Sequence, residues 1–441
     1  MKFKQFLLVA FAVSFTLGAC RKSDDDTPEE QKEPEELSGD ITTSRTLTAD
    51  KVWVLDGTVI VKNNAQLTIE PGTIVKGKIG KKSSLAISQG SKIIADGTAE
   101  KPIVFTSGAP VGQRKAGDWG GVILIGRATT NRTVPVTIEG GVNLTYGTEK
   151  IDNDNSGILR YVRIEYAGIG TNDSEINSLT LYAVGSGTVL DHIQTSYAND
   201  DAFEFFGGTV NATHLVAYAT ADDDFDFDFG YNGTVQYAVA LREPKTADPA
   251  DDANGVECDN DKDGTDATPI THPKLSNITI IGPNNAAGTH ERHAYGNRWR
   301  RGTKFTFNNS IILGSQKGGL NIEGDKSANF YKNGDSQFKN NIVASFTAPF
   351  LTNATATVLT ATEMQTKSLA EGNVSIAANA VNLTSAFSLS SPNFLPATGS
   401  PALQGTFVAV PGAASVTYRG AFGTSNWASG WVNWDPQNKV Y

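Results

Sequence analysis

Short apolar runs separated by turn residues make up most of this chain. From about residue 41 onward, Gly, Asn and Asp separate runs rich in Val, Ile and Leu, such as residues 59–61, 67–69, 103–105 and 122–125. This pattern predicts short β-strands, because β-branched residues favour the pleated backbone and Gly, Asn and Asp favour turns. Sustained helical periodicity is scarce, and residues 361–370 are the best candidate for a helix.

Two acidic and aromatic segments repeat at a constant distance. Asp200-Asp-Ala-Phe-Glu-Phe205 aligns with Asp222-Asp-Asp-Phe-Asp-Phe227 at an offset of 22 residues, and His192 and His214 share that offset. A repeat of about 20–25 residues is typical of a parallel β-helix, in which the strands of successive coils stack on one another, so His192 and His214 are expected to stack. We therefore expect an all-β protein folded as a right-handed parallel β-helix. An antiparallel sandwich is the alternative, but it requires hairpin turns roughly every 8–12 residues, and such signals are few.

The predicted β-helix spans residues 41–410, with a long insertion at about residues 244–274 and a C-terminal cap at residues 411–441. Three of the later runs begin with asparagine, at Asn277, at Asn308-Asn309 and at Asn340-Asn341. Asparagine side chains at equivalent positions of successive coils can form a ladder, so we expect each amide to bond the amide of the next coil.

Three tryptophans lie close together near the end of the chain. Trp427, Trp431 and Trp434 recur at the spacing of one face of a short helix. One interpretation is an aromatic platform that binds sugar. We favour an aromatic cap over the C-terminal end of the solenoid, because an uncovered last coil would expose strand edges and apolar core.

The first 20 residues carry the signature of a targeting signal. Lys2 and Lys4 precede an apolar run that ends at Gly18 and is too short to cross a bilayer as a helix. Leu17-Gly-Ala-Cys20 resembles a bacterial lipobox, so residues 1–19 are expected to be a removable signal peptide and Cys20 to be the lipidated residue. The alternative is an ordinary secretory signal in which Cys20 occurs by chance.

Residues 20–40 are charged, contain proline and have almost no apolar side chains, which predicts a disordered acidic tether. Ser23-Asp-Asp-Asp26 resembles the acidic export signal of surface lipoproteins of Bacteroidota. The expected location is therefore the outer membrane, with a lipid anchor and exposure on the cell surface. The alternative interpretation is a solvated spacer without a targeting role.

Composition narrows the possible partners. The chain has 441 residues, with 37 Lys and Arg against 47 Asp and Glu, for a net charge of -10. This balance argues against a nucleic-acid partner, which requires a basic surface. Once Cys20 is acylated, Cys258 is the one remaining cysteine, so stability must come from packing, strand pairing or a metal instead of an intrachain disulfide.

The 22-residue repeat predicts stacked carboxylates on the outside of the β-helix. The phenylalanines that alternate with these acids, which are Phe203, Phe205, Phe225, Phe227 and Phe229, are expected to point into the core. Successive coils lie about 4.8 Å apart, so Asp200 is expected beside Asp222 and Glu204 beside Asp226. Two ionised carboxylates at that distance repel by about 3.5 kcal/mol at an effective dielectric constant near 20. The acids expected to hold a cation are Asp200, Asp201, Glu204, Asp222, Asp223, Asp224, Asp226 and Asp228.

Calcium is the best-matched cation for this set, because it accepts about six to eight oxygen ligands in flexible geometry. An arginine network is the second possibility. Arg242 follows the acidic coils, and the densest basic cluster contains Arg298, Arg300 and Arg301. A solvated acidic face is the third.

A second calcium signal lies in the predicted insertion. Asp259, Asp261 and Asp263 occupy positions 1, 3 and 5 of a calcium loop, and Gly264 follows at the sharp turn. Position 12 is Ile270 instead of Glu, so the loop is not a complete EF-hand. We expect a calcium staple here, with an acidic loop that binds no ion as the alternative.

Several longer motifs point to one family. They are Gly117-Asp-Trp-Gly-Gly121, Leu159-Arg-Tyr-Val-Arg-Ile-Glu-Tyr166, Asp200-Asp-Ala-Phe-Glu-Phe-Phe-Gly-Gly-Thr-Val210, Asp222-Asp-Asp-Phe-Asp-Phe-Asp-Phe-Gly230 and Tyr418-Arg-Gly-Ala-Phe-Gly423. Together they resemble a family of β-helical surface lipoproteins of Bacteroidota over most of residues 45–441. The resemblance implies the fold and the location. The role of that family is largely unassigned, so the resemblance implies no reaction and no catalytic residues.

Two functional hypotheses remain open. The first is a non-enzymatic, calcium-stabilised surface lipoprotein that binds a glycan, a peptide or an outer-membrane partner such as a TonB-dependent barrel. The second is a calcium-dependent polysaccharide lyase, or a glycoside hydrolase, that acts on acidic polysaccharide. In the lyase, Arg300 or Arg301 would remove the proton next to a substrate carboxylate that calcium holds. Fold alone cannot supply a reaction, and the first hypothesis is favoured.

Overall fold

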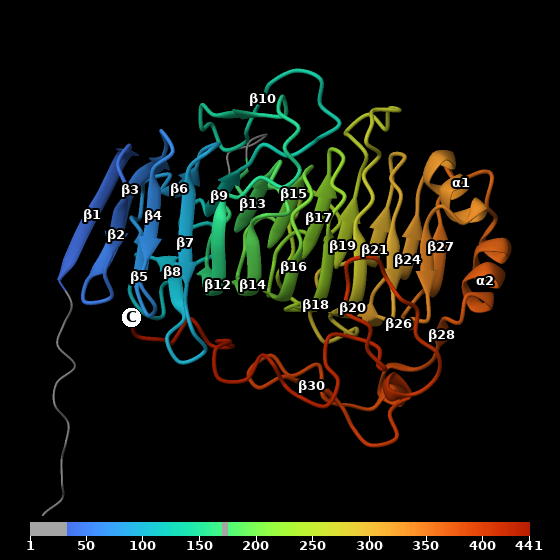
Figure 1. Cartoon of the computed structure of the whole chain (residues 1–441). Coiled ribbons are helices and arrows are strands. Elements are labelled where there is room, and N and C mark those ends of the chain that lie inside the picture. The colour runs from blue at the N-terminus through green and yellow to red at the C-terminus, as the bar shows by residue number, and fades with distance from the viewer. Residues whose placement is uncertain (1–32, 170–174) are drawn as a thin grey trace, which may run out of the picture. The chain divides into compact units, whose positions relative to one another are not determined.

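The computed structural model describes residues 33–169 and 175–441, which form a parallel β-helix (Figure 1). Within these residues, 26 strands join one sheet through parallel pairings, which confirms the all-β solenoid. The predicted signal peptide, Cys20 and most of the predicted tether lie outside the described residues. The first strand, β1 (Pro34–Ile41), pairs with β3 (Val52–Val61), so the β-helix begins earlier than the predicted residue 41.

Each coil contributes strands to three faces. The first face stacks β2 (Arg45–Leu47), β4 (Gln66–Ile69), β7 (Lys92–Asp96), β22 (Thr306–Asn308) and β25 (Gln337–Lys339). The second face stacks β5 (Ile74–Gly77), β8 (Ile103–Ser107), β23 (Ile311–Ser315), β26 (Ile342–Ser345) and β28 (Val374–Ser375). In the middle coils, longer strands cross from the first face to the second: β12 (Gly157–Glu165), β14 (Val189–Ser196), β16 (Ala212–Tyr218), β18 (Thr234–Leu241) and β20 (Lys274–Ile281).

The third face carries the acidic repeat. It stacks β6 (Ser84–Ile87), β9 (Val122–Ile125), β13 (Leu179–Tyr182), β15 (Phe203–Phe206), β17 (Phe225–Asp228), β19 (Val256–Cys258), β21 (Tyr295–Trp299), β24 (Gly318–Ile322) and β27 (Ala348–Thr352). A long loop between β9 and β12 contains a small hairpin of β10 (Val136–Thr137) and β11 (Thr145–Tyr146).

One residue per coil turns the chain from the first face to the second. From β12 onward these residues, which we call the corner row, have left-handed φ angles between 49° and 59°: Tyr161, His192, His214, Tyr237, Asn277, Asn309 and Asn340. Asn and His tolerate this conformation better than most residues. The three asparagines therefore occupy equivalent corners, as predicted.

We expected the asparagine amides of the corner row to bond to one another, but they do not. Instead, Asn277 donates to the carbonyl of Tyr418 at 2.9 Å and Asn309 to that of Val408 at 2.7 Å. Both carbonyls belong to the C-terminal segment, residues 376–441, which packs against this corner.

The interior is filled by apolar side chains in register. Phe203 stacks on Phe225, with 5.4 Å between ring centroids, and Phe205 stacks on Phe227 at 4.9 Å. All four rings are buried, which confirms that the phenylalanines of the acidic repeat point inward while the acids between them point outward. Phe229 is the exception, since it packs outside the solenoid in a separate cluster with Phe206.

Two α-helices lie within the described residues, near the end of the solenoid opposite β1 (Figure 1). α1 spans Asp325–Asn333. α2 spans Ala361–Ala370, as predicted, and begins with a capping box between Thr360 and Glu363. α2 contacts β27 and buries Met364 in the main core, so it helps to cover the last coils. No helix within residues 33–169 and 175–441 combines the length and apolar character needed to cross a membrane.

The C-terminal segment runs back along the flank of the β-helix (Figure 1). It contains η1 (Ala378–Val381), an antiparallel pair of β29 (Leu383–Ser385) and β30 (Asn393–Pro396), and η2 (Pro401–Leu403). The predicted tryptophan cluster is present and packed on the solenoid. It lies along the flank and not over the last coil, because Trp434 contacts Tyr218 and the final carbonyl of Tyr441 accepts a bond from Lys76 in β5.

Candidate cation site

Acidic side chains form a row across the outer surface of the third face. Glu204 of β15 pairs in register with Asp226 of β17, and Asp226 pairs with Glu257 of β19. The predicted stacking of Glu204 beside Asp226 is therefore confirmed. Thr180 of β13 precedes this row and Arg298 of β21 follows it.

Asp201 and Asp223 form a second row at the turn before the third face. The backbone N–H of Asp223 donates to the carboxylate of Asp201 at 2.8 Å, and the N–H of Asn254 donates to that of Asp223 at 2.6 Å. Asn177 accepts in the same way from the N–H of Asp201 at 3.2 Å. Asn177, Asp201, Asp223 and Asn254 thus form a ladder, in which each of the first three side chains accepts from the backbone N–H of the next residue. The second carboxylate oxygen of each aspartate remains for other partners.

Members of both rows, together with Asp200 and Asp222 directly before the second row in the sequence, form a group that we call the carboxylate cluster: Asp200, Asp201, Glu204, Asp222 and Asp226. Carboxylate oxygens of Asp200, Asp201 and Asp222 lie within 4.8 Å of one another, and so do those of Asp201, Glu204 and Asp226. None of the ion pairs between described residues includes a member of this cluster. Asp201 and Glu204 are buried, with 7% and 8% exposed, so solvent screens them poorly.

Burial and mutual repulsion disfavour the ionised forms of these acids. Burial, together with the charge of Asp222, raises the pKa of Asp200 well above its usual range. Burial, with the charges of Glu139 and Asp226, does the same to the pKa of Glu204. Burial raises the pKa of Asp222 to about 7 and that of Asp226 to about 6. Without a cation, the cluster must take up protons near neutral pH.

The polar surroundings of the cluster suit a hard cation. Thr180 is 1% exposed, pairs in register with Glu204, and its hydroxyl has no hydrogen-bond partner. The amide of Asn177 donates to Glu204 and so orients that carboxylate. Carboxylates and an unpartnered hydroxyl are ligands that Ca²⁺ accepts, and the donor set fits this ion better than softer metals.

Other acids of the predicted set are paired with arginine. Asp224 is fully buried and accepts from Arg242 at 2.8 Å, and this arginine is 3% exposed. Asp259 accepts from Arg300 at 3.0 Å and from Arg301 at 2.5 Å. The arginine alternative therefore holds for Asp224, and Asp259 of the predicted calcium loop is also paired with arginine. Asp228 accepts the N–H of Phe229 at 2.6 Å, and no ion pair between described residues includes it.

The calcium-loop interpretation of residues 259–264 does not match the contacts. Asp259 is held by its two arginines, and Asp261 accepts from the backbone N–H groups of Asp263 and Thr265 at 2.9 and 3.1 Å. Asp263 is exposed. Because each carboxylate has a different environment, the three acids do not converge on one ion within the described residues.

The predicted insertion at residues 244–274 contains a third copy of the acidic repeat. β19 lies inside it and pairs with β17 and β21, so two loops flank a regular strand. Asn254-Gly-Val-Glu-Cys258 aligns with Asp223-Asp-Phe-Asp-Phe227, and Asn254 takes the ladder position 31 residues after Asp223. Sequence reasoning missed Glu257 because the loop before it is longer than in the preceding coil.

Glu257 belongs to a group of paired charges that we call the arginine group. Its arginines are Arg298, Arg300 and Arg301, and its acids are Glu257, Asp259 and Glu323. Arg298 donates to Glu323 at 2.8 Å and to Glu257 at 3.2 Å, and Arg300 bridges Glu257 and Asp259. The charges of Glu257 and Asp259 outweigh burial and raise the pKa of Arg300 above its ordinary value. This arginine is therefore poorly suited to act as a base.

Cys258 offers no nucleophile. Its side chain is buried, its sulfur lies 2.9 Å from the hydroxyl of Thr303, and burial raises the pKa of the thiol well above its usual range.

The comparisons with known proteins agree with this architecture. Residues 39–431 match the family model described as the pectate-lyase like beta helix domain. No curated protein and no solved structure matches the chain.

Proposed function

Because the chain belongs to the family of pectate-lyase-like β-helix domains, we propose that its third face binds Ca²⁺ and that the protein is a calcium-stabilised binding component of the outer membrane. The observation that carries this proposal is the carboxylate cluster, in which two groups of three acids converge without a basic partner among the described residues. A Ca²⁺ ion would replace the mutual repulsion of these acids with attraction.

The proposed address follows from the N-terminal residues. Cys20 would carry the lipid anchor, and the acidic residues after it would direct the protein to the cell surface. A single residue with more than one acyl chain gives stable membrane attachment. A fatty-acid label that is incorporated into the native chain but not into Cys20→Ser tests the anchor, and protease treatment of intact cells tests surface exposure.

The proposed partner is a TonB-dependent barrel or another outer-membrane protein, together with a glycan or peptide ligand. Co-purification from the native membrane tests this partner.

Calorimetric titration of the full chain with Ca²⁺ tests the cation site. We expect saturable binding, and we expect a chelator to lower the melting midpoint because an ion that binds only the folded state stabilises it. Glu204→Gln and Asp226→Asn should each weaken binding by about tenfold or more, since each removes a charged ligand. Asp263→Asn is the matched control, because this acid is exposed and outside the cluster.

Absence of binding heat at millimolar Ca²⁺, together with an unchanged midpoint in chelator, would remove the calcium site. A loss of binding in Asp263→Asn alone would move it to the loop at residues 259–264.

The family match also supports a second candidate, a calcium-dependent polysaccharide lyase or a hydrolase of acidic polysaccharide. In the lyase, cluster-bound Ca²⁺ would hold the substrate carboxylate while Arg300 or Arg301 removes the neighbouring proton. The pairing of Arg300 with Glu257 and Asp259 speaks against this role. Purified protein with polygalacturonate or alginate and Ca²⁺ provides the test, because lyase products absorb in the ultraviolet. We expect no absorbance change; a change that Arg300→Lys abolishes would make the protein a lyase.

A further inference from the structure

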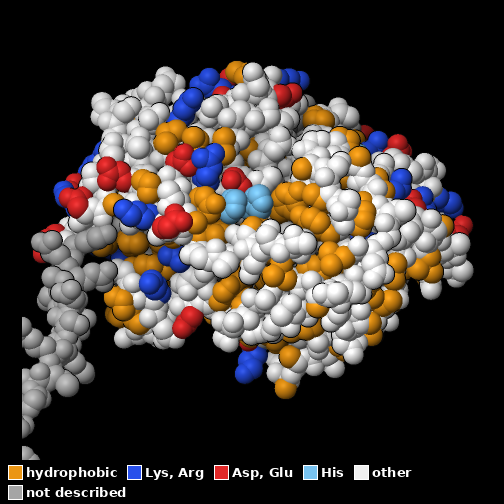
Figure 2. Space-filling view, turned by 60° about the horizontal axis from the view of Figure 1, so that its bottom comes forward, with side chains coloured by type: hydrophobic (Ala, Val, Ile, Leu, Met, Phe, Trp, Pro, Cys, Tyr) orange, Lys and Arg blue, Asp and Glu red, His pale blue; other side chains and the backbone are white. Residues whose placement is uncertain are grey.

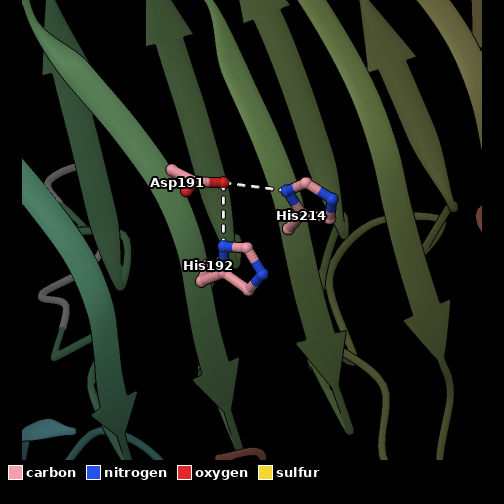
Figure 3. Close-up of side chains that lie close together, drawn as sticks. All are labelled: Asp191, His192 and His214. Carbon is pink, nitrogen blue, oxygen red and sulfur yellow. Dashed lines mark hydrogen bonds and ion pairs between the residues drawn. The ribbon is translucent and has the colours of Figure 1, made fainter. Parts of the chain in front are cut away.

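A second cluster of ligand-type side chains lies far around the coil from the acids, at the corner between the first and second faces. It contains Asp191 and His192 of β14 and His214 of β16 (Figure 3). Both histidines turn Nδ1 toward the same carboxylate oxygen of Asp191, at 2.9 Å for His192 and 2.8 Å for His214. One donor atom from each residue lies within 4.8 Å of the others.

The fold places the two imidazoles together through the corner row. His192 and His214 occupy equivalent left-handed positions in successive coils, with φ of 54° and 55°. Their rings stack with centroids 4.2 Å apart, which confirms the stacking expected from their 22-residue offset. Tyr161 stacks on His192 at 4.4 Å and Tyr237 stacks on His214 at 5.1 Å. The pair is therefore held between two aromatic rings.

One ring nitrogen of this cluster lacks a satisfactory partner. The Asp191 oxygen already accepts from the hydroxyl of Thr213 and from Nδ1 of His214, each at 2.8 Å. Nδ1 of His192 is buried and lies at 2.9 Å from the same oxygen, but it makes no correctly directed hydrogen bond. Two nitrogens thus converge on one carboxylate oxygen that can satisfy only one of them well.

We propose that Asp191, His192 and His214 form a binding site for a divalent transition metal of the Zn²⁺ class. Two imidazoles and one carboxylate are a set that such ions prefer, and three protein ligands leave a position open for water or another ligand. In a tetrahedral site with bonds of about 2.0–2.1 Å, neighbouring ligand atoms lie about 3.3 Å apart. The nitrogen-to-oxygen separations here are 2.8 and 2.9 Å, so the groups need to open by about half an ångström and the stacked rings need to tilt.

The surroundings support an ion at this position. Arg160 lies 3.8 Å from the other oxygen of Asp191 and also pairs with Asp96 at 2.8 Å, so it orients the carboxylate while its own charge is offset. Asp191 and His214 are each 25% exposed, which leaves a path from solvent. On the face seen in Figure 2, histidine side chains reach the surface among hydrophobic side chains.

The test is a titration of the full chain with Zn²⁺, read by calorimetry, and with Cu²⁺, read by tryptophan fluorescence. Trp427 lies 5.1 Å from the ring of His214, and Trp431 lies 5.6 Å from that of His192, so bound Cu²⁺ should quench their emission. We expect one Zn²⁺ per chain, competition between Zn²⁺ and Cu²⁺, and no competition by Ca²⁺, which prefers oxygen ligands.

The corner row itself supplies the variants. Asn occupies the equivalent position at residues 277, 309 and 340 with φ of 58°, 54° and 56°, so His192→Asn and His214→Asn should keep the backbone turn. Each should weaken Zn²⁺ binding by about tenfold or more, as should Asp191→Asn. His290→Asn is the control, because this histidine lies in a separate loop after β20, and Asp226→Asn should leave the Zn²⁺ titration unchanged.

No Zn²⁺ binding at millimolar concentration, or binding that survives in both His192→Asn and His214→Asn, would overturn the proposal. Loss of binding in His290→Asn alone would also overturn it. If a corner variant fails to fold, X-ray absorption of the Zn²⁺-loaded native chain decides. Scattering from two imidazoles in a shell of nitrogen and oxygen supports the site, and any other shell contradicts it.

Discussion

Two neighbouring parts of the third face both bring acidic side chains close together, but their negative charge is balanced in different ways. The carboxylate cluster on β15, β17 and the turns before them has no basic partner among the described residues. One coil further, the arginine group places Arg298, Arg300 and Arg301 against Glu257 and Asp259. The strands share one alternation of inward apolar and outward acidic residues, so the difference lies only in where the positive charge comes from.

This difference indicates which acids can respond to their surroundings. In the arginine group the counter-charge is part of the chain and cannot leave. In the carboxylate cluster the counter-charge must come from protons or from an ion in solution, so the stability of this part should depend on pH and on Ca²⁺. Substitutions of the same type should therefore have opposite effects in the two parts.

The largest expected effect comes from the buried pair of Asp224 and Arg242. Arg242→Met leaves the carboxylate of Asp224 buried and uncompensated, and such a break costs about 3–5 kcal/mol. Urea denaturation should show this loss in the free energy of unfolding. The double variant with Asp224→Asn should recover part of it, and a loss below about 1 kcal/mol would contradict the assignment.

The metal-free protein should become more stable as the pH falls. The folded pKa of Asp222, at about 7, lies above its usual value of 3.8, so the folded state binds more protons than the unfolded state between these values. The free energy of unfolding should decrease by about 3 kcal/mol as the pH rises from 4 to 7. Melting in chelator over this range measures the slope, and saturating Ca²⁺ should flatten it. A flat profile in chelator would contradict the prediction.

Glu204→Gln and Glu257→Gln test the comparison directly, because both acids belong to one row on the third face. In chelator at pH 8, Glu204→Gln should stabilise the protein by about 1–3 kcal/mol, since it removes repulsion from Asp226. Glu257→Gln should destabilise it, because Arg298 and Arg300 lose their partner. Changes of the same sign in chemical denaturation would contradict the distinction between the two parts.

The smallest effect is expected at the solvent-exposed end of the arginine group. Arg301 is 41% exposed, and Asp259 keeps its bonds to Arg300 when Arg301 is removed. Arg301→Ala should therefore change the free energy of unfolding by less than about 1 kcal/mol, measured under the same conditions. A larger loss would show that Arg301 holds the neighbouring loop in place.

The parts of the fold that follow from local periodicity could be predicted from the sequence. The 22-residue offset correctly placed Glu204 beside Asp226 and His192 beside His214, because neighbouring coils of equal length keep their residues in register. α2 was predicted to the residue, since its capping and composition are local properties. β19 was missed because unequal loops interrupt the repeat on both sides of it.

Contacts between distant parts of the chain could not be predicted in this way. The sequence offers Arg242 and Arg300 as candidate partners but does not say which acids they meet. The register of β19 and β21 decides that Arg300 meets Glu257 and Asp259 and leaves Asp226 unpaired. The path of the C-terminal segment likewise depends on bonds to distant coils, from 99 residues away at Asn309 to 365 residues away at Lys76, for which no spacing in the sequence is diagnostic.

The path of the C-terminal segment should affect how the protein unfolds under force or heat. In a solenoid whose coils touch only their neighbours, the terminal coils can peel away one at a time. Here the last residues are tied by hydrogen bonds to Asn309, Gln236, Gln194, Arg114 and Lys76, which belong to successively earlier coils. The C-terminal segment therefore links coils along the length of the solenoid. The last coils cannot unfold without detaching this segment, which also contacts the middle and the first coils. Unfolding should accordingly be more nearly all-or-none than the stacked architecture alone would suggest.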